Sequence, residues 1–365
     1  MSDIYNGFFL NKRVLITGHT GFKGSWLSLW LTKLGASVAG ISLDPPTDPS
    51  LFDLLDLAHV TRWHRVEIQD SKAVTDIVHV EEPEIVFHLA AQPLVPLSYE
   101  QPLLTYSTNV MGTVNILEAA KKQSSIRSIV VVTTDKCYEN KEWPWGYREC
   151  DELGGYDPYS SSKACAELVV KAYRSSFFNP AEYGRKHRTR LATARAGNVI
   201  GGGDWARDRL IPDIFRALFS KQRIVLRNPG AIRPWQHVLD PLSGYLELAK
   251  RLYLDEKDYS GAWNFGPAPD SAKTVEWVVS QVREQWGSPI DVETKNAEGY
   301  HEAGILTLDN AKATRLLSLS PNWKIEKTVR KTVEWYRAYF DRKDMMNLSL
   351  AQLEEFEKDR VNANI

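Results

Sequence analysis

A hydroxyl, a carboxylate and an amine follow one another at the end of an apolar run near the middle of the chain. Residues 128–132 lead directly into Thr134, Asp135 and Lys136. A continuous β-branched run of this kind predicts a strand that is covered on both faces, as in parallel sheets. Ligands of open α/β sheets bind beyond the carboxyl ends of such strands. These three side chains could therefore face a ligand; the alternative is a helix-capping Asp135 and a solvated Lys136.

A tyrosine and a lysine four residues apart form a second candidate reactive group. Asp157 is a good N-cap and Pro158 a good first helical residue, which predicts a helix over residues 159–178. Tyr159 and Lys163 then share one face of this helix. The same spacing occurs twice more in the chain, but only this pair follows the reactive strand end. We interpret the other two pairs as ordinary helix surface.

Three glycines stand between the first predicted strand and the first predicted helix. Residues 12–17 form the strand, and Gly18, Gly21 and Gly24 precede the helical run 25–31. Glycines at such a turn permit a sharp bend, a close approach of the backbone to a pyrophosphate and close packing of the helix on the strand. The free amides at the helix start would bind phosphate oxygens.

A carboxylate follows at the distance that a dinucleotide-binding site requires. The second predicted strand, residues 37–43, ends in Asp44, which lies 20 residues after Gly24. An acidic residue at this interval binds the adenosine ribose, so the sequence favours NAD over NADP, whose 2′-phosphate Asp44 would repel. A phosphate-binding loop of the NTPase type is disfavoured because Lys23 is followed by glycine and not by serine or threonine.

Short apolar runs and longer amphipathic runs continue to alternate up to residue 195. The further predicted strands are residues 65–68, 84–90 and 190–195, and the further predicted helices are residues 71–81 and 102–123. This alternation predicts an α/β fold with a doubly wound parallel sheet of the Rossmann type. Asp70 could bind the adenine amino group or cap the helix after it, and Asn109 could bridge toward the site or lie on the surface. We interpret His88 as a core residue.

The alternation stops near residues 201–205, where Gly-Gly-Gly-Asp-Trp marks a change of organisation. We predict a smaller α/β substrate lobe at residues 196–365, interleaved with a dinucleotide-binding domain made of residues 1–195 and of 236–262. The lobe carries the basic and aromatic residues Trp205, Arg207, Arg209, Arg227, Arg233, Trp235 and His237. Guanidinium groups bind phosphates through paired hydrogen bonds and aromatic faces stack on bases, although a solvated basic edge is the alternative.

The composition restricts the class of partner. The chain has 365 residues, 43% hydrophobic and 25% charged, with a net charge of −1, which gives no electrostatic reason to expect nucleic acid or a membrane as partner. Its three cysteines show no paired spacing, and no signal peptide or apolar run of about 18 residues occurs. We expect a cytoplasmic protein that acts on a small molecule and holds no metal.

Four motifs stand in the order found in one enzyme superfamily. Residues 17–24, 88–91, 133–136 and 158–163 resemble those of the extended short-chain dehydrogenase/reductases. Within them, residues 21–27, 135–138, 201–205 and 233–237 are most similar to the family of CDP-D-glucose 4,6-dehydratases, and the resemblance runs from about residue 9 to 336. Thymidine-linked glucose dehydratases carry Asp-Glu where this chain has Asp-Lys. Some UDP-N-acetylglucosamine 4,6-dehydratases also carry Asp-Lys and stay an alternative, as do nucleotide-sugar 4-epimerases and a non-catalytic dinucleotide-sensing protein.

The resemblance implies a lyase with tightly bound NAD, which converts CDP-D-glucose to CDP-4-keto-6-deoxy-D-glucose for deoxysugar biosynthesis of the O-antigen type. Thr134 would position the sugar, Tyr159 with Lys163 would act as base at carbon 4, Asp135 would protonate the leaving hydroxyl, and Lys136 would remove the carbon 5 proton. The pKa of Lys136 would have to fall well below about 10.4 through burial or nearby cations.

The resemblance also implies the full set of binding residues. The expected NAD contacts are Gly18, Thr20, Gly21, Phe22, Gly24, Asp44, Ile68, Asp70, Leu89, Ala90, Ala91, Asn109, Tyr159 and Lys163. The expected substrate contacts are Gln92, Asn198, Arg207, Arg209, Arg233, Trp235 and His237. A homodimer or a dimer of dimers is implied, paired through helices 102–123 and 159–178.

Overall fold

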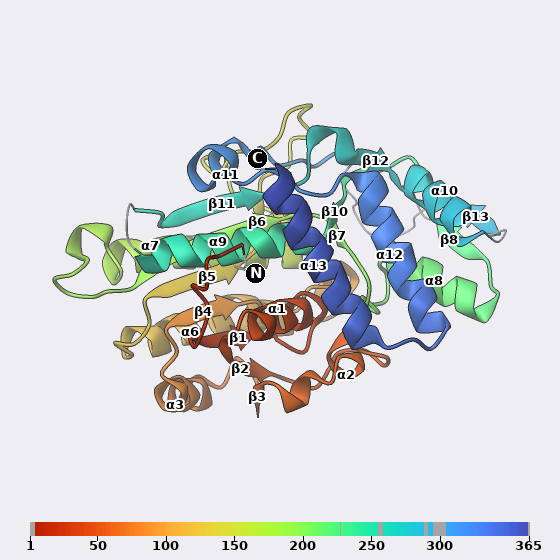
Figure 1. Cartoon of the computed structure of the whole chain (residues 1–365). Helices are drawn as coiled ribbons and strands as arrows, with labels where there is room; N and C mark the ends of the chain where they lie inside the picture. Colours follow the sequence, from red (N-terminus) through yellow and green to blue (C-terminus); the bar gives the residue numbers. More distant parts are fainter. Residues whose placement is uncertain (1–3, 227, 255–257, 288–290, 295–303, 364–365) are drawn as a thin grey trace.

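A parallel sheet of seven strands forms the centre of the computed structural model, which describes residues 4–226, 228–254, 258–287, 291–294 and 304–363 (Figure 1). The strand order is β11-β6-β5-β4-β1-β2-β3, and every neighbouring pair is parallel. The strands are β1 (Arg13–Thr17), β2 (Ser37–Ser42), β3 (Arg62–Arg65), β4 (Ile85–His88), β5 (Ser128–Val132), β6 (Arg190–Ala196) and β11 (Gly261–Phe265). The predicted doubly wound α/β sheet is confirmed.

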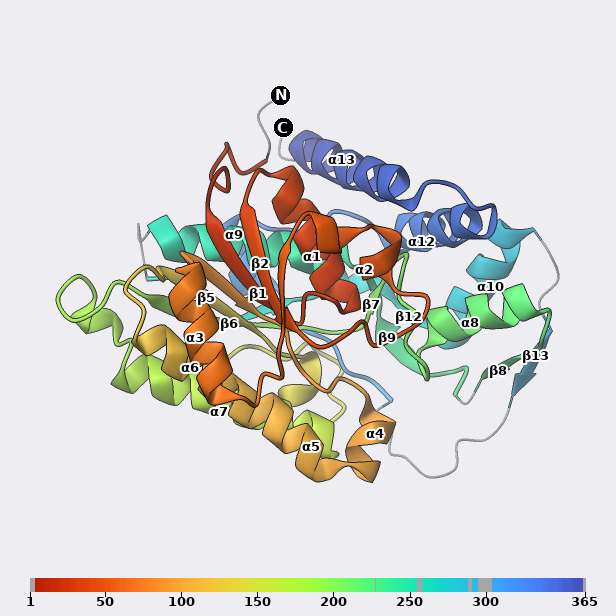
Figure 2. The same ribbon diagram turned by 90° about the horizontal axis from the view of Figure 1, so that it is seen from below.

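Helices cover both faces of the sheet because successive strand residues point to opposite sides. Val14 and Ile16 of β1 belong to a core shared with α1 (Phe22–Lys33) and α9 (Leu239–Leu254). Leu15 faces the other core, under α3 (Ser71–Glu81), α6 (Gly112–Lys121) and α7 (Pro158–Ser176). The two layers of helices are seen on either side of the sheet in Figure 2.

Two of the predicted elements differ from the structure. The strand predicted at residues 65–68 lies at Arg62–Arg65, because β3 pairs only with β2, which ends at Ser42 opposite Arg65. Residues 66–68 continue beyond the sheet. The helix predicted at residues 102–123 is divided into α5 (Pro102–Tyr106), a π-helical turn (Ser107–Met111) and α6.

A second region lies beside the carboxyl edge of the sheet. Its elements are β7 (Val199–Ile200), α8 (Leu210–Ser220), β8 (Ile224–Leu226), β9 (Ile232–Pro234), β10 (Gln236–His237), β12 (Ala272–Thr274), α10 (Val275–Trp286), β13 (Val292–Thr294) and α12 (Ile325–Phe340). Its strands form three two-stranded sheets. Between β10 and β12 the chain returns to the main sheet through α9 and β11. The division into two domains stays a prediction.

The helix α13 (Met345–Ala363) crosses the outside of α1 and α12 (Figures 1 and 2). It is joined to α1 by hydrogen bonds from Trp30 Nε1 and Lys33 Nζ to the carboxylate of Glu357, at 2.8 and 2.7 Å. In the part of the chain that the structure describes, no helix has the length and apolar character needed to cross a bilayer.

Candidate active site

The carboxyl ends of the central strands open into one large cleft, with a volume of about 1660 Å³. The glycine turn after β1, the end of β2, the loop after β4 and the reactive residues after β5 all line it. The opposite wall is formed by residues 203–213, by β8 and by Trp235 of the second region. This is the crevice in which open α/β sheets bind ligands.

The glycine turn is closely packed. Gly18 has φ +75°, and a Cβ there would lie 2.8 Å from the Ala90 nitrogen. A Cβ on Gly24 would lie 2.2 Å from the Gly18 oxygen. Gly21 precedes α1 without a side-chain cap, so the first amides of α1 are available to an anion. The turn therefore fits the pyrophosphate of a dinucleotide.

Most of the residues expected to contact the rest of the cofactor line the cleft, and two do not. Those that line the cleft are Gly18, Thr20, Gly21, Phe22, Gly24, Asp44, Ile68, Leu89, Ala90 and Ala91. Asp44 is exposed at the end of β2 and is ion-paired with Arg65. The Thr20 hydroxyl bonds to Ser42 Oγ at 2.6 Å, which holds the turn against β2.

Two of the expected cofactor contacts have other roles in the described structure. Asp70 does not line the cleft, and its Oδ1 accepts a hydrogen bond from the Ala73 amide at 3.0 Å. It is thus the cap of α3, the alternative that the sequence left open. Asn109 is buried behind the lining, where its Oδ1 accepts from the Gln92 amide and its Nδ2 donates to Ser162 Oγ, both at 2.8 Å. Asn109 therefore bridges the loop after β4 to α7.

The strand end and the start of α7 bring the reactive side chains together. Thr134 and Asp135 follow β5 at a short turn, and Thr134 Oγ1 donates to Asp135 Oδ1 at 3.0 Å. Thr134 lies beside the Tyr159 phenol and partly offsets the rise in its pKa. Lys163, one turn further along α7, donates its Nζ to the Val132 carbonyl at 3.3 Å. The phenol, the hydroxyl and the carboxyl thus face one point of the cleft.

Burial controls the protonation of these groups. It raises the pKa of Asp135, which is 3% exposed, above its ordinary value, against the opposing charge of Lys136 and the hydrogen bond from Thr134. Burial also raises the pKa of Tyr159 to about 12 and lowers the pKa of Lys163 to about 8. The positive charge of Arg209 counteracts the rise in the pKa of Tyr159.

The amine expected to be buried is exposed, and another amine of the cleft is partly buried. Lys136 lies in the cleft lining as an exposed residue. Lys23, in the glycine turn, also lines the cleft, and burial together with the nearby Arg209 lowers the pKa of Lys23 to about 8. Its charge interacts favourably with Asp135. A lysine inside a glycine turn was the signal that we overlooked.

Five of the residues expected to contact the substrate line the cleft, and two do not. Asn198, Arg207, Arg209, Arg233 and Trp235 line the cleft. Arg209 is ion-paired with Asp204 at 3.0 Å. Among the described residues, Gln92 and His237 do not line it. The side-chain nitrogen of Gln92, Nε2, donates to the Leu94 carbonyl and to Thr105 Oγ1. This side chain therefore stabilises the loop after β4.

His237 is fully buried and packs against the rings of Trp26 and Trp323, with centroids 6.5 and 4.7 Å away. Burial lowers the pKa of His237 to about 3. The structure therefore places it in the core and not at a substrate. Arg227, also considered from the sequence, lies outside the described residues.

Comparison with known proteins places these features in context. A family model described as GDP-mannose 4,6 dehydratase matches residues 15–332. The CDP-glucose 4,6-dehydratase of Salmonella typhimurium is 52% identical over 97% of this chain and 98% of its own length. The solved structure of the epimerase Mth375 from Methanothermobacter thermautotrophicus has a TM-score of 0.79 at 21% identity, covering 93% of this chain and 96% of the other.

A further solved structure is that of the UDP-glucose 4-epimerase of Thermus thermophilus in complex with NAD. It covers 89% of this chain and 98% of its own, with a TM-score of 0.74 at 22% identity. At such identities the two epimerase structures show the shared fold. The Thermus structure also shows NAD bound to a structural neighbour.

Proposed function

Because this chain belongs to the GDP-mannose 4,6 dehydratase family, we propose that it removes water from CDP-D-glucose to give CDP-4-keto-6-deoxy-D-glucose. The substrate is suggested by the relative that is 52% identical over nearly the whole chain. The observation that carries the proposal is the meeting of Tyr159 and Asp135 in one cleft. A 4-epimerase needs the phenol but has no step that requires the buried acid.

The cofactor is NAD, which the glycine turn and Asp44 would hold. The packing around Gly18 and Gly24 and the uncapped start of α1 support this assignment. When bound, NAD supplies the hydride acceptor and donor for carbons 4 and 6 and a positive charge beside the phenol.

The side chains divide the proton transfers between them. Tyr159 takes the proton of the carbon 4 hydroxyl as a phenolate, the form that the positive charge of bound NAD would favour. Thr134, which lies beside Tyr159 and donates to Asp135, orients that oxygen. Asp135 donates a proton to the departing carbon 6 hydroxyl, and burial raises the pKa of this carboxyl, which favours the protonated form that the role requires. Lys136 removes the carbon 5 proton and returns a proton to carbon 5 when the hydride is delivered to carbon 6.

The second region binds the nucleotide end of the substrate. Arg207, Arg209 and Arg233 bring guanidinium groups to its wall of the cleft, where they would hold the diphosphate. Trp235 is 4% exposed, and its indole nitrogen donates to the Lys273 carbonyl. We therefore assign to Trp235 the shaping of the wall more than stacking on the base.

The protein pairs as a homodimer, alone or within a dimer of dimers, through α5, the π-helical turn and α7. Leu103, Met111 and Leu168 expose 85%, 50% and 54% of their surface there, and exposed apolar residues of this size mark interaction surfaces when they gather. A cytoplasmic location is supported by the free thiols of Cys137, Cys150 and Cys165.

The substrate assignment is tested by incubating the protein and NAD with CDP-, UDP-, GDP- and dTDP-glucose and with UDP-N-acetylglucosamine. Loss of water, measured by mass spectrometry, is expected for CDP-glucose with kcat/KM at least about tenfold above the others, because one unmatched base edge costs a factor of this order. Preference for UDP-N-acetylglucosamine would assign the protein to the alternative dehydratase. A carbon 4 epimer without water loss would assign it to the epimerases.

A further inference from the structure

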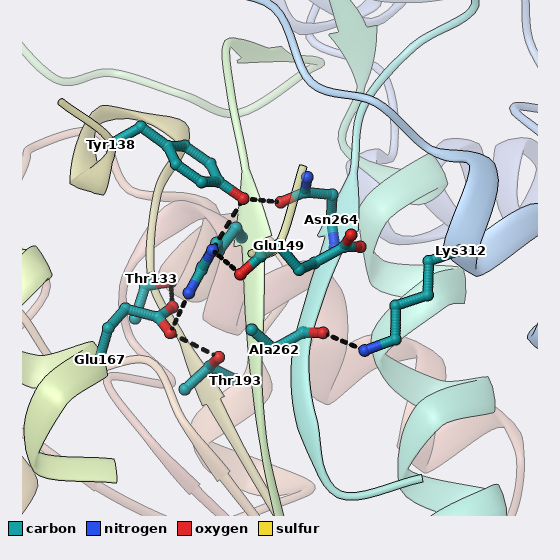
Figure 3. A network of polar contacts seen from close by, with 9 residues as sticks. Thr133, Tyr138, Glu149, Glu167, Thr193, Ala262, Asn264 and Lys312 are labelled. Atoms are coloured by element: carbon teal, nitrogen blue, oxygen red, sulfur yellow. Dashed lines mark hydrogen bonds and ion pairs between the residues drawn. The ribbon is translucent and has the colours of Figure 1, made fainter. Parts of the chain in front are cut away.

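A buried ion pair lies directly behind the reactive strand end. Glu167 of α7 and Arg195 of β6 are joined at 2.7 Å, with side chains only 2% and 3% exposed. Figure 3 shows the carboxylate of Glu167 beside Thr133 and Thr193, within a group of polar side chains from separate elements of the sheet and its helices. Replacing a buried ion pair by apolar residues is often neutral or stabilising, so stability alone gives a weak reason for its presence.

The carboxylate of Glu167 is bonded to the strand that carries the reactive residues. Its Oε1 accepts from Thr133 Oγ1 at 2.6 Å, and its Oε2 accepts from Thr193 Oγ1 at 2.8 Å (Figure 3). Lys163, one turn earlier on the same helix, donates to the Val132 carbonyl. Helix α7 is therefore attached to two successive residues of the β5 end, immediately before Thr134.

Arg195 holds the other end of the same short turn. Its Nη1 donates to the Tyr138 hydroxyl at 2.7 Å and to the Glu149 carbonyl at 3.3 Å. The Tyr138 hydroxyl donates in turn to Asn264 Oδ1 of β11 at 2.8 Å (Figure 3). The turn that carries Asp135 and Lys136 thus lies between two residues with hydrogen bonds to the ion pair. Thr133, before the turn, is hydrogen-bonded to Glu167, and Tyr138, after it, is hydrogen-bonded to Arg195.

We propose that Glu167 is a positioning residue, which acts through Thr133 to set Thr134 and Asp135 against Tyr159 and Lys163. The two halves of the catalytic set come from different elements, a strand end and a helix, and the Glu167–Thr133 hydrogen bond joins them directly. A displacement of about 1 Å between reacting groups can cost on the order of 100-fold in rate. This inference rests on the proposed dehydratase function.

The chain offers a matched pair of variants. Thr133→Val and Thr193→Val each remove one buried hydroxyl that donates to the same carboxylate, with almost no change of volume. Only Thr133 belongs to the strand end that precedes the reactive residues. We expect Thr133→Val to lower kcat for CDP-glucose dehydration by about 10- to 100-fold, with the KM for CDP-glucose within about twofold of the wild type. Thr193→Val should change kcat by less than about threefold, although its melting temperature should fall by about as much as that of Thr133→Val.

Two further variants complete the test. Thr133→Ser keeps the hydroxyl and should retain kcat within about threefold of the wild type. In a Glu167→Leu background, where no side-chain oxygen accepts from residue 133, Thr133→Val should lower kcat by less than about threefold more. Equal losses of kcat in Thr133→Val and Thr193→Val, or a serine variant as slow as the valine one, would overturn the positioning role. A wild-type protein that leaves CDP-glucose unchanged would instead overturn the proposed function, so the two failures are distinguishable.

Discussion

Replacement of Tyr159 by phenylalanine is expected to lower kcat for CDP-glucose by at least about 1000-fold, while KM changes by less than about threefold. Phenylalanine fills the same space beside Thr134 but has no oxygen to take the proton of the carbon 4 hydroxyl. Since oxidation at carbon 4 must precede the loss of water, the whole reaction stops there. The rate of product formation under saturating NAD and CDP-glucose measures the effect.

Tyr339→Phe is the matched control for this experiment. Tyr339 also stands four residues before a lysine, Lys343, and does not line the cleft of the described structure. It is partly buried, with its ring against Trp205 and Trp335, and not ordinary helix surface as predicted. This variant should keep at least about half of the wild-type kcat, because phenylalanine keeps the ring that makes these contacts. A Tyr159→Phe variant that retained most of the wild-type activity would remove the phenol from the mechanism.

Asp135→Asn is expected to lower the rate of water loss by about 10²- to 10⁴-fold, the range of general acid catalysis. Asparagine has the same shape but cannot protonate a leaving hydroxyl. Because burial raises the pKa of Asp135, the wild-type acid stays protonated to a higher pH than a free carboxyl. The wild-type rate should therefore fall as the pH rises through that raised pKa, and this dependence should be absent in the variant.

The comparison variant is Asp56→Asn, which changes a carboxylate with 72% of its side chain exposed outside the cleft lining. It should behave as the wild type in both rate and pH dependence. Mass spectrometry of the product over a series of pH values gives both quantities. Water loss by Asp135→Asn at the wild-type rate would show that another group is the acid.

The site could be foreseen to the extent that it follows from strand topology. Parallel strands bring their carboxyl ends to one edge, so residues after β1, β2 and β5 had to meet once these strands were recognised. Asp70 and Ser71 likewise signalled the start of α3, which begins at Ser71 as predicted. Local sequence patterns thus predicted both the α/β fold class and the edge of the sheet at which the candidate catalytic residues meet.

Side-chain burial could not be foreseen, because it depends on residues far apart in the sequence. His237 lies between Trp26 and Trp323, which no local pattern connects. Burial and the charge of Arg209, a residue far from Lys23 in the sequence, lower the pKa of Lys23. The register of β3, an edge strand that pairs on one side only, was also open in the sequence.

The Glu167–Arg195 pair did leave a signal. Arg195 interrupts a small apolar strand, and Glu167 is four residues after Lys163 on a helix face that the strand end must contact. A charge at a position that periodicity assigns to the interior needs a partner. Two such charges on neighbouring elements could have been paired before the structure was known.

The central claim is that one sugar ring meets Tyr159 and Asp135 in a single cleft, so that carbon 4 and carbon 6 react within one binding event. CDP-glucose labelled with deuterium at carbon 4, mixed with unlabelled CDP-glucose, tests this most directly through mass and NMR spectra of the product. The account predicts that the deuterium appears at carbon 6 of the molecules that carried it at carbon 4. Deuterium lost to water, transferred to unlabelled molecules or retained at carbon 4 would contradict it.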